Sequence, residues 1–149
     1  MILLALLLQS AAPACTAEAP PPVGLEAWKT ISAMSMGPIG LNATTGLMLQ
    51  SSDKVAFALP PERAPGAGSF AGVYTFNIAT PGTYRVALSA GAWIDVVRDG
   101  KSIASAAHTE GPPCSGIRKI VDFTLVPGRY TLQLSGAKSA EMRVLIATK

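Results

Sequence analysis

Charged residues are scarce in this sequence of 149 residues. They make up 14% of the chain, against about 25% in an average globular protein, while hydrophobic residues reach 49%. That balance excludes an intrinsically disordered chain. The 12 basic and 9 acidic residues give a formal net charge of +3. The basic residues are scattered, with Arg118-Lys119 as the only adjacent pair, so we expect no nucleic-acid partner.

Histidine and cysteine are also rare. His108 is the only histidine, and Cys15 and Cys114 are the only cysteines. The sequence contains neither a glycine-rich phosphate loop that opens a helix nor a G-x-S-x-G nucleophile elbow. We therefore assign no catalytic residue, and the leading hypothesis below needs no cofactor.

Long apolar runs are missing as well. A membrane-spanning helix needs about 20 apolar residues, and the unbroken run from Ile2 to Leu8 has seven. Small residues follow it through Ala14, an order typical of a secretory signal peptide. Ala12-Pro13-Ala14 offers a cleavage site, so we predict a signal peptide over residues 1–14 and an exported, periplasmic or extracellular protein.

Cys15 follows the predicted cleavage site directly, and three fates are open to it. It could be lipidated, which would bring the protein to a membrane, or it could be removed. It could also form a disulfide with Cys114, which would stabilise the fold by roughly 4–5 kcal/mol in the chain-entropy model. Prolines 20–22 predict a tether, so residues 15–40 are assigned to a tether and N-terminal segment. Within it, residues 24–36 predict one short helix or an edge strand.

From about residue 44, apolar residues alternate with polar or small ones, and glycine or proline marks each interruption. This alternation predicts an all-β domain over residues 41–149, an antiparallel, jelly-roll-like β-sandwich of about eight or nine short strands. The predicted strands cover residues 45–50, 54–59, 74–78, 84–88, 92–98, 101–107, 121–125, 130–134 and 141–147. Asp99-Gly100 predicts a hairpin turn of type I′.

Two stretches of the chain repeat one pattern. The sequence FNIATPGTY, residues 76–84, corresponds to FTLVPGRY, residues 123–130. Each predicts a strand, a Pro-Gly turn of type II and a second strand that opens with an inward tyrosine. We expect two similar hairpins in one sandwich.

The pattern Y-x-F-x-I…PGxYxVxLS, W-I-D-V-V, D-G and F-x-L-x-PGxYxLxLSG covers about residues 70–147. It resembles the bacterial pre-peptidase C-terminal domain, a secreted β-sandwich. The resemblance implies a non-catalytic accessory module of an exported protein, and some such modules bind polymers. Some relatives bind calcium through clustered acidic residues. This sequence has no such cluster, so no calcium site is carried over.

The loop that contains His108, Glu110 and Cys114 is the densest polar stretch. With AWIDVV and SGIRK it also resembles small exported proteins labelled homogentisate 1,2-dioxygenase. A non-haem iron oxygenase holds iron through two histidines and a carboxylate, whereas His108 is alone here. Imidazole, carboxylate and thiolate also bind zinc. A small metal-dependent enzyme, with zinc or non-haem iron on these three residues, is therefore the alternative to a binding module.

The candidate binding residues are Trp93, Asp95, His108, Arg118 and Lys119. Trp93 and Asp95 share one face of a predicted strand, where an exposed indole would suit stacking on a sugar; the alternative is a tryptophan in the core. Arg118 and Lys119 could meet an anionic group of a polysaccharide or a partner protein, or could keep a sheet edge soluble. We therefore hypothesise an exported, non-catalytic module that contacts carbohydrate, envelope polymer or a protein partner.

Overall fold

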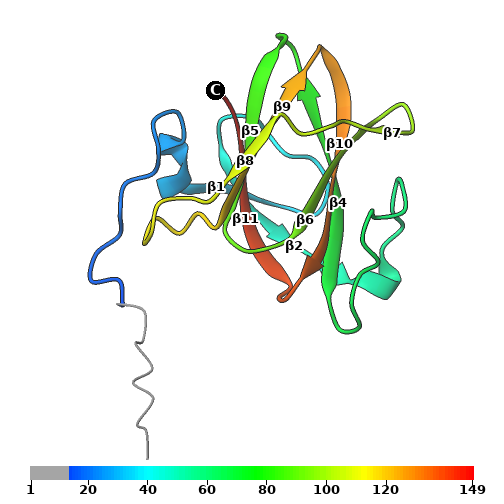
Figure 1. Ribbon diagram of the computed structural model, residues 1–149, viewed down its shortest axis with the longest axis horizontal. Helices are drawn as coiled ribbons and strands as arrows, with labels where there is room; N and C mark the ends of the chain where they lie inside the picture. The colour runs from blue at the N-terminus through cyan, green and yellow to red at the C-terminus, as the bar shows by residue number, and fades with distance from the viewer. Residues whose placement is uncertain (1–13) are drawn as a thin grey trace, which may run out of the picture.

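The computed structural model describes residues 14–149, and these residues form two β-sheets that pack face to face (Figure 1). The first sheet has the order β1 (Ile31–Ser35), β2 (Thr44–Met48), β11 (Glu141–Thr148), β5 (Gly82–Leu88), β9 (Lys119–Leu125) and β8 (Ala107–Thr109). The second has the order β3 (Gln50–Ser51), β4 (Phe70–Ile78), β10 (Gly128–Ala137), β6 (Trp93–Arg98) and β7 (Lys101–Ser102). Two 3₁₀ helices, η1 (Glu26–Lys29) and η2 (Ser52–Lys54), complete the elements. The predicted signal peptide lies outside the described residues except for Ala14.

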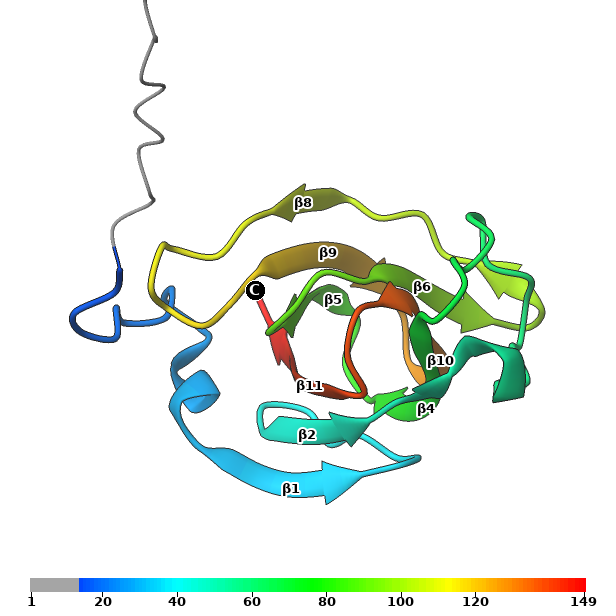
Figure 2. The same ribbon diagram turned by 90° about the horizontal axis from the view of Figure 1, so that it is seen from below.

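The all-β sandwich predicted from the alternation is confirmed. Every strand pair is antiparallel except β1 with β2, which run parallel at one edge of the first sheet (Figure 2). The Asp99-Gly100 turn is also confirmed, because both residues have the positive φ angles of type I′, 50° and 71°. Between residues 14 and 149, no helix is both long and apolar enough to cross a bilayer.

The main core lies between the sheets. Each strand turns alternate side chains inward, and the buried set includes Leu47, Tyr74, Phe76, Val86, Leu88, Val96, Phe123, Leu132, Leu134, Val144 and Ile146. Burial of each large apolar side chain contributes roughly 1.5–3 kcal/mol. Phe76 of β4 and Tyr130 of β10 stack with their ring centroids 5.5 Å apart.

The repeated Pro-Gly segments build two equivalent corners. The Tyr84 hydroxyl donates to the Thr80 carbonyl at 2.6 Å, and the Tyr130 hydroxyl donates to the Val126 carbonyl at 2.7 Å. Both tyrosine rings are buried, as predicted. The prediction of hairpins is wrong, however, because β4 and β5 belong to different sheets, as do β9 and β10. The predicted type II turns are not formed either, because Gly82 has no positive φ angle and the φ of Gly128 is 151°, whereas the turn needs about 80° at its glycine. Each turn carries the chain across the sandwich, since the tyrosine ring occupies the corner between the layers.

The strand predicted over residues 54–59 is not formed. The side chain of Gln133 on β10 takes the place of a strand partner for this segment. Its Oε1 accepts a hydrogen bond from the Ala58 amide at 2.9 Å, and its Nε2 donates to the Leu59 carbonyl at 2.9 Å. Gln133 is fully buried, and it holds residues 54–59 as a loop although their alternating pattern predicts a strand.

The strand predicted over residues 101–107 is divided between the two sheets. β7 extends the second sheet, and β8 pairs with β9 in the first. Ile103 still donates its amide to the Val96 carbonyl at 2.8 Å, whereas Ala106 donates to the Asp122 carbonyl of β9. The small residues between Ile103 and Ala106 belong to neither sheet, and the chain passes there from the second sheet to the first.

The N-terminal segment, residues 15–40, packs on the first sheet. Residues 24–36 contain both elements considered for them, because η1 is followed by the edge strand β1. Trp28 joins a second apolar cluster on the outer face of the first sheet, the face turned away from the second sheet. The cluster consists of Leu25, Trp28, Ala87, Ile117, Ile120, Leu145 and Ala147. The expected tether is thus held against the sandwich, and Ala19 donates its amide to the Cys114 carbonyl at 2.8 Å.

Candidate functional site

Trp93 is the centre of the strongest candidate site, and it is partly exposed at the start of β6. The Arg63 guanidinium carbon lies 5.5 Å from the ring centroid, and the Lys119 ammonium nitrogen lies 5.7 Å from it. The indole Nε1 donates to Asp95 Oδ1 at 3.2 Å. We call Arg63, Trp93, Asp95 and Lys119 the Trp93 site.

Three separate parts of the chain supply this site. The chain after β5 crosses to the second sheet through residues 89–92, which brings Trp93 to the end of the sandwich. Lys119 opens β9 opposite Leu88, and its ammonium donates to the Ala92 carbonyl at 2.9 Å. Arg63 comes from the loop whose backbone is bound by Gln133.

Asp95 holds the indole in place through its hydrogen bond with Nε1. It is buried, with 8% of its surface exposed, and it also accepts a hydrogen bond from Gln133 Nε2 at 3.4 Å. Burial raises the pKa of Asp95, an effect that the two hydrogen bonds oppose and the charge of Glu62 reinforces. Burial also lowers the pKa of Lys119. Asp95 is buried and Lys119 is half-buried, so the site is partly sheltered from water, and charges interact more strongly there than on an open surface.

A cavity of about 300 Å³ opens beside the indole and is lined by Arg63, Ala64, Pro65, Ala92, Trp93, Ser135 and Gly136. A larger cleft of about 820 Å³ lies between η2 and the proline-rich loop. Its lining is mostly proline, glycine and serine, with Asp53 as the one charged residue. Ligand sites combine apolar surface with a few convergent polar groups. The smaller cavity meets that description better, because it places a cation beside an aromatic ring.

The other predicted binding residues do not join the Trp93 site. Arg118 forms an exposed ion pair with Glu110, with Nη1 3.2 Å from Oε1, and such pairs are worth about 1 kcal/mol or less. His108 lies on the edge strand β8, opposite Val121 of β9, and is exposed. Of the five residues predicted from the sequence, the structure brings together Trp93, Asp95 and Lys119.

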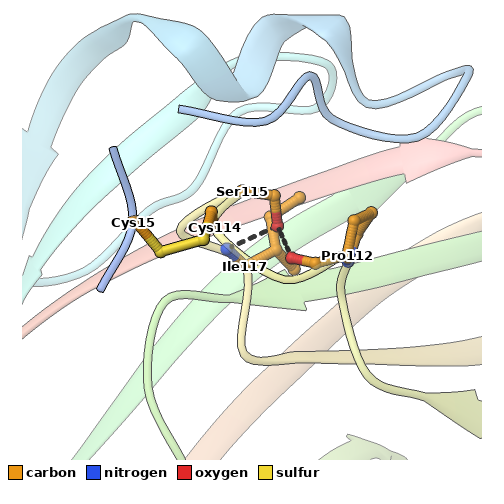
Figure 3. The surroundings of a disulfide bond; sticks show 5 residues. All are labelled: Cys15, Pro112, Cys114, Ser115 and Ile117. Atoms are coloured by element: carbon orange, nitrogen blue, oxygen red, sulfur yellow. Dashed lines mark hydrogen bonds between the residues drawn. A yellow bond between two sulfur atoms is a disulfide. The ribbon is translucent and has the colours of Figure 1, made fainter. Parts of the chain in front are cut away.

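The metal-ligand set of His108, Glu110 and Cys114 is wrong. Cys114 is joined to Cys15 by a disulfide across 99 residues, with Cα atoms 5.6 Å apart (Figure 3), so its sulfur is no thiolate ligand. In residues 14–149 no three His, Cys, Asp or Glu side chains are grouped to hold a metal ion. The structure thus selects one of the three fates considered for Cys15. Lipidation would need the same sulfur atom.

The loop around this disulfide is tightly bonded. The Ser115 hydroxyl donates to the Pro112 carbonyl at 2.6 Å and accepts a hydrogen bond from the Ile117 amide at 3.2 Å (Figure 3). Ser115 is fully buried and Ile117 nearly so. The loop predicted to present ligand-binding groups therefore anchors the N-terminal segment.

The sequence did not predict two residues, Arg63 of the Trp93 site and Gln133, which supports the site from β10. Gln133 lies between Leu132 and Leu134, so the alternation placed it on an open face. Nothing in the sequence says that the proline-rich loop folds back over that face. The sequence offers two signals only, the long proline-rich loop before Phe70 and the polar Gln133 within an apolar strand, and nothing connects them.

The comparisons with known proteins found similarity at the level of the fold. No family model and no curated protein matches the sequence. The fold is similar to the solved structure of the pre-peptidase C-terminal domain of a collagenase from Bacillus anthracis, with 19% sequence identity and a TM-score of 0.47. The match covers 78% of this chain and 96% of that chain.

Proposed function

We propose that this protein is an exported, non-catalytic binding module that recognises anionic groups of a polysaccharide through the Trp93 site. The observation that carries the proposal is the pair of cations over one indole ring. Arg63 and Lys119 come from distant parts of the chain, yet both lie within 6 Å of the same ring centroid. A cation within about 6 Å of an aromatic centroid is attracted by the electrons of the ring, so the indole stabilises both charged groups beside it.

The chemistry of these cations suits a carboxylate. A guanidinium presents a planar fork that can bind both carboxylate oxygens, while an ammonium acts as a compact point charge. The indole is held by Asp95 and adds apolar surface beside them. The ring does not serve as the bare stacking platform considered from the sequence, because the two cations lie over it. The ligand is therefore an acidic sugar polymer rather than a neutral one.

Export is supported by the disulfide and by the leader-like sequence before it. Disulfides persist in oxidising compartments such as the periplasm and the cell exterior. Residues 2–14 combine an apolar run with small residues at an A-x-A site. A binding module outside the cytoplasm would meet envelope polymers directly.

The test is affinity electrophoresis in gels that contain polygalacturonate, an acidic polysaccharide, or dextran, a neutral one. We expect retardation only by polygalacturonate. Trp93→Ala, Arg63→Gln and Lys119→Gln should each weaken binding about tenfold or more, because a charge-assisted contact is worth about 1.5–3 kcal/mol.

Arg118→Gln is the matched control, since it removes one neighbouring positive charge outside the site. Its affinity should stay within about twofold of the wild type, a change far smaller than 1.4 kcal/mol. Thermal unfolding of each variant checks that the fold is intact. Equal losses in Arg118→Gln and Lys119→Gln, or equal retardation by dextran, would show a nonspecific surface and contradict the proposal.

A further inference from the structure

The edge strand β1 is paired on one side only. Within residues 14–149 its single partner strand is β2 (Figure 2). A strand at the edge of a sheet presents unpaired N–H and C=O groups along its free side. The other three edge strands, β3, β7 and β8, have only two or three residues, whereas β1 has five. It is therefore the longest free edge in the part of the chain that the structure describes.

This edge lacks charged residues. None occurs between Lys29 and Asp53, a stretch that contains all of β1, β2 and β3. Natural edge strands usually carry charges, often from lysine, which discourage pairing with other chains. Four of the five residues of β1 are exposed, and Ile31 and Met34 have exposed fractions of 46% and 65%. The strand thus combines free backbone groups with exposed apolar side chains.

The rest of the fold holds β1 at both ends. Before the strand, the Ala27 carbonyl of η1 accepts a hydrogen bond from Thr44 Oγ1 at 2.8 Å. After it, the Gly37 carbonyl accepts a hydrogen bond from the Thr75 amide at 3.0 Å, and the Ile39 amide donates to the Thr75 carbonyl at 2.8 Å. Because the strand is already extended and fixed, pairing with a second strand costs little further ordering.

Ile31 and Met34 lie on the same side of the sheet. The register with β2 skips one residue between Ile31 and Ala33, and the Ile31 and Met34 side chains line one cavity of about 370 Å³. The charged residues that line this cavity, Glu141 and Arg143, belong to β11, which is two strands in from the edge. A strand added to the free side of β1 would therefore have uncharged neighbours on β1.

We propose that two copies of this chain pair through β1 in an antiparallel dimer with two-fold symmetry. In such an interface a strand lies against its own copy, so a charged residue would meet the same charge. β1 has no charge to repel its copy and none to attract a charged strand of another protein. The register that pairs all five residues places Ala33 opposite the same residue of the second copy. The inference rests on the edge strand and does not depend on the proposed function.

The test is sedimentation velocity of the oxidised protein from about 10 µM to about 1 mM, because a short edge interface is expected to be weak. The wild type should shift from monomer toward dimer over this range. Ala33→Lys and Ala33→Glu should each weaken dimerisation about tenfold or more, since each places two like charges opposite one another. An equimolar mixture of the two variants should restore the dimer, because lysine then faces glutamate.

Ser102→Lys is the matched control, because it adds the same charge at an exposed position of another edge strand, β7. It should dimerise as the wild type does. Ala33 is also exposed, and thermal unfolding of each variant checks that the fold is intact. The proposal would be overturned by a wild type that stays monomeric at about 1 mM or by Ala33 variants that dimerise as the wild type does. Equal weakening in Ser102→Lys, or a mixture of the Ala33 variants that stays monomeric, would also overturn it.

Discussion

Replacing Cys15 and Cys114 together by serine is expected to lower the free energy of unfolding by about 4 kcal/mol. The disulfide closes a loop across 99 residues, and a loop of that length removes much conformational entropy from the unfolded chain. The expected loss can be measured by urea unfolding of the wild type and the double variant, followed by far-UV circular dichroism. Reduction of the wild type should give a similar loss.

The oxidised wild type should also show no reactive thiol in a colorimetric assay without denaturant. Two titratable thiols per chain in the native protein would contradict the pairing. So would equal urea midpoints for the wild type and the double variant. Ser139→Ala changes an exposed loop residue and serves as the control, with an expected change within about 0.5 kcal/mol.

Trp28→Ala is expected to cost about 3–5 kcal/mol. The indole is completely buried in the outer cluster, and the Arg143 guanidinium lies 5.1 Å from its centroid. The loop after the disulfide closes over it, since a Cβ on Gly116 would lie 3.4 Å from Trp28 Nε1. Within residues 14–149 this Nε1 has no hydrogen-bond partner. Trp28→Phe, which forfeits no hydrogen bond, should therefore cost clearly less than Trp28→Ala.

Trp93→Ala is the comparison for this effect, because Trp93 is only partly buried. Its cost should be less than half that of Trp28→Ala. The disulfide and Trp28 hold the same N-terminal segment, so the loss in a variant lacking both should be smaller than the sum of the separate losses. Full additivity would show that the disulfide and Trp28 stabilise the fold independently. A cost below about 1 kcal/mol for Trp28→Ala would show that the segment is not part of the cooperative fold.

The sequence predicts the strands well where alternation and turn residues agree. The segments around Tyr84 and Tyr130 were found with their inward rings, and Asp99-Gly100 was found with its turn type. A Pro-Gly turn specifies a change of direction but not the sheet that receives the next strand. The two corners were therefore predicted as hairpins, although each crosses between the layers.

The N-terminal segment was harder to predict because its partners are distant in the sequence. β11 contains Val144-Leu145-Ile146-Ala147, a continuous apolar run that indicates a strand covered on both faces. The cover itself is supplied by Leu25 and Trp28, more than 110 residues earlier. Neither residue lies in a periodic pattern, so the packing that holds the segment could not be derived from local spacing.

The candidate site shows the same division. The alternation on β6 correctly placed Trp93 and Asp95 on one side, where a hydrogen bond joins them. It could not separate Lys119 from Arg118, because the connection after β5 decides which of the two reaches the indole. Arg63 lies on the loop that Gln133 binds at the Ala58 amide, and that hydrogen bond joins residues 75 apart in the sequence.

The two tryptophans of the chain allow the most direct test of the proposed binding site. In a two-dimensional ¹⁵N–¹H spectrum each indole Nε1–H gives one signal, and Trp93 and Trp28 can be assigned from the Trp93→Phe variant. Titration of the wild type with oligogalacturonate should shift the Trp93 indole signal, whose donor bonds Asp95 beside Arg63 and Lys119. The buried Trp28 signal should stay in place. A Trp93 signal that stays fixed up to millimolar ligand, or one that moves no more than the Trp28 signal, would contradict recognition of an acidic polysaccharide at this site.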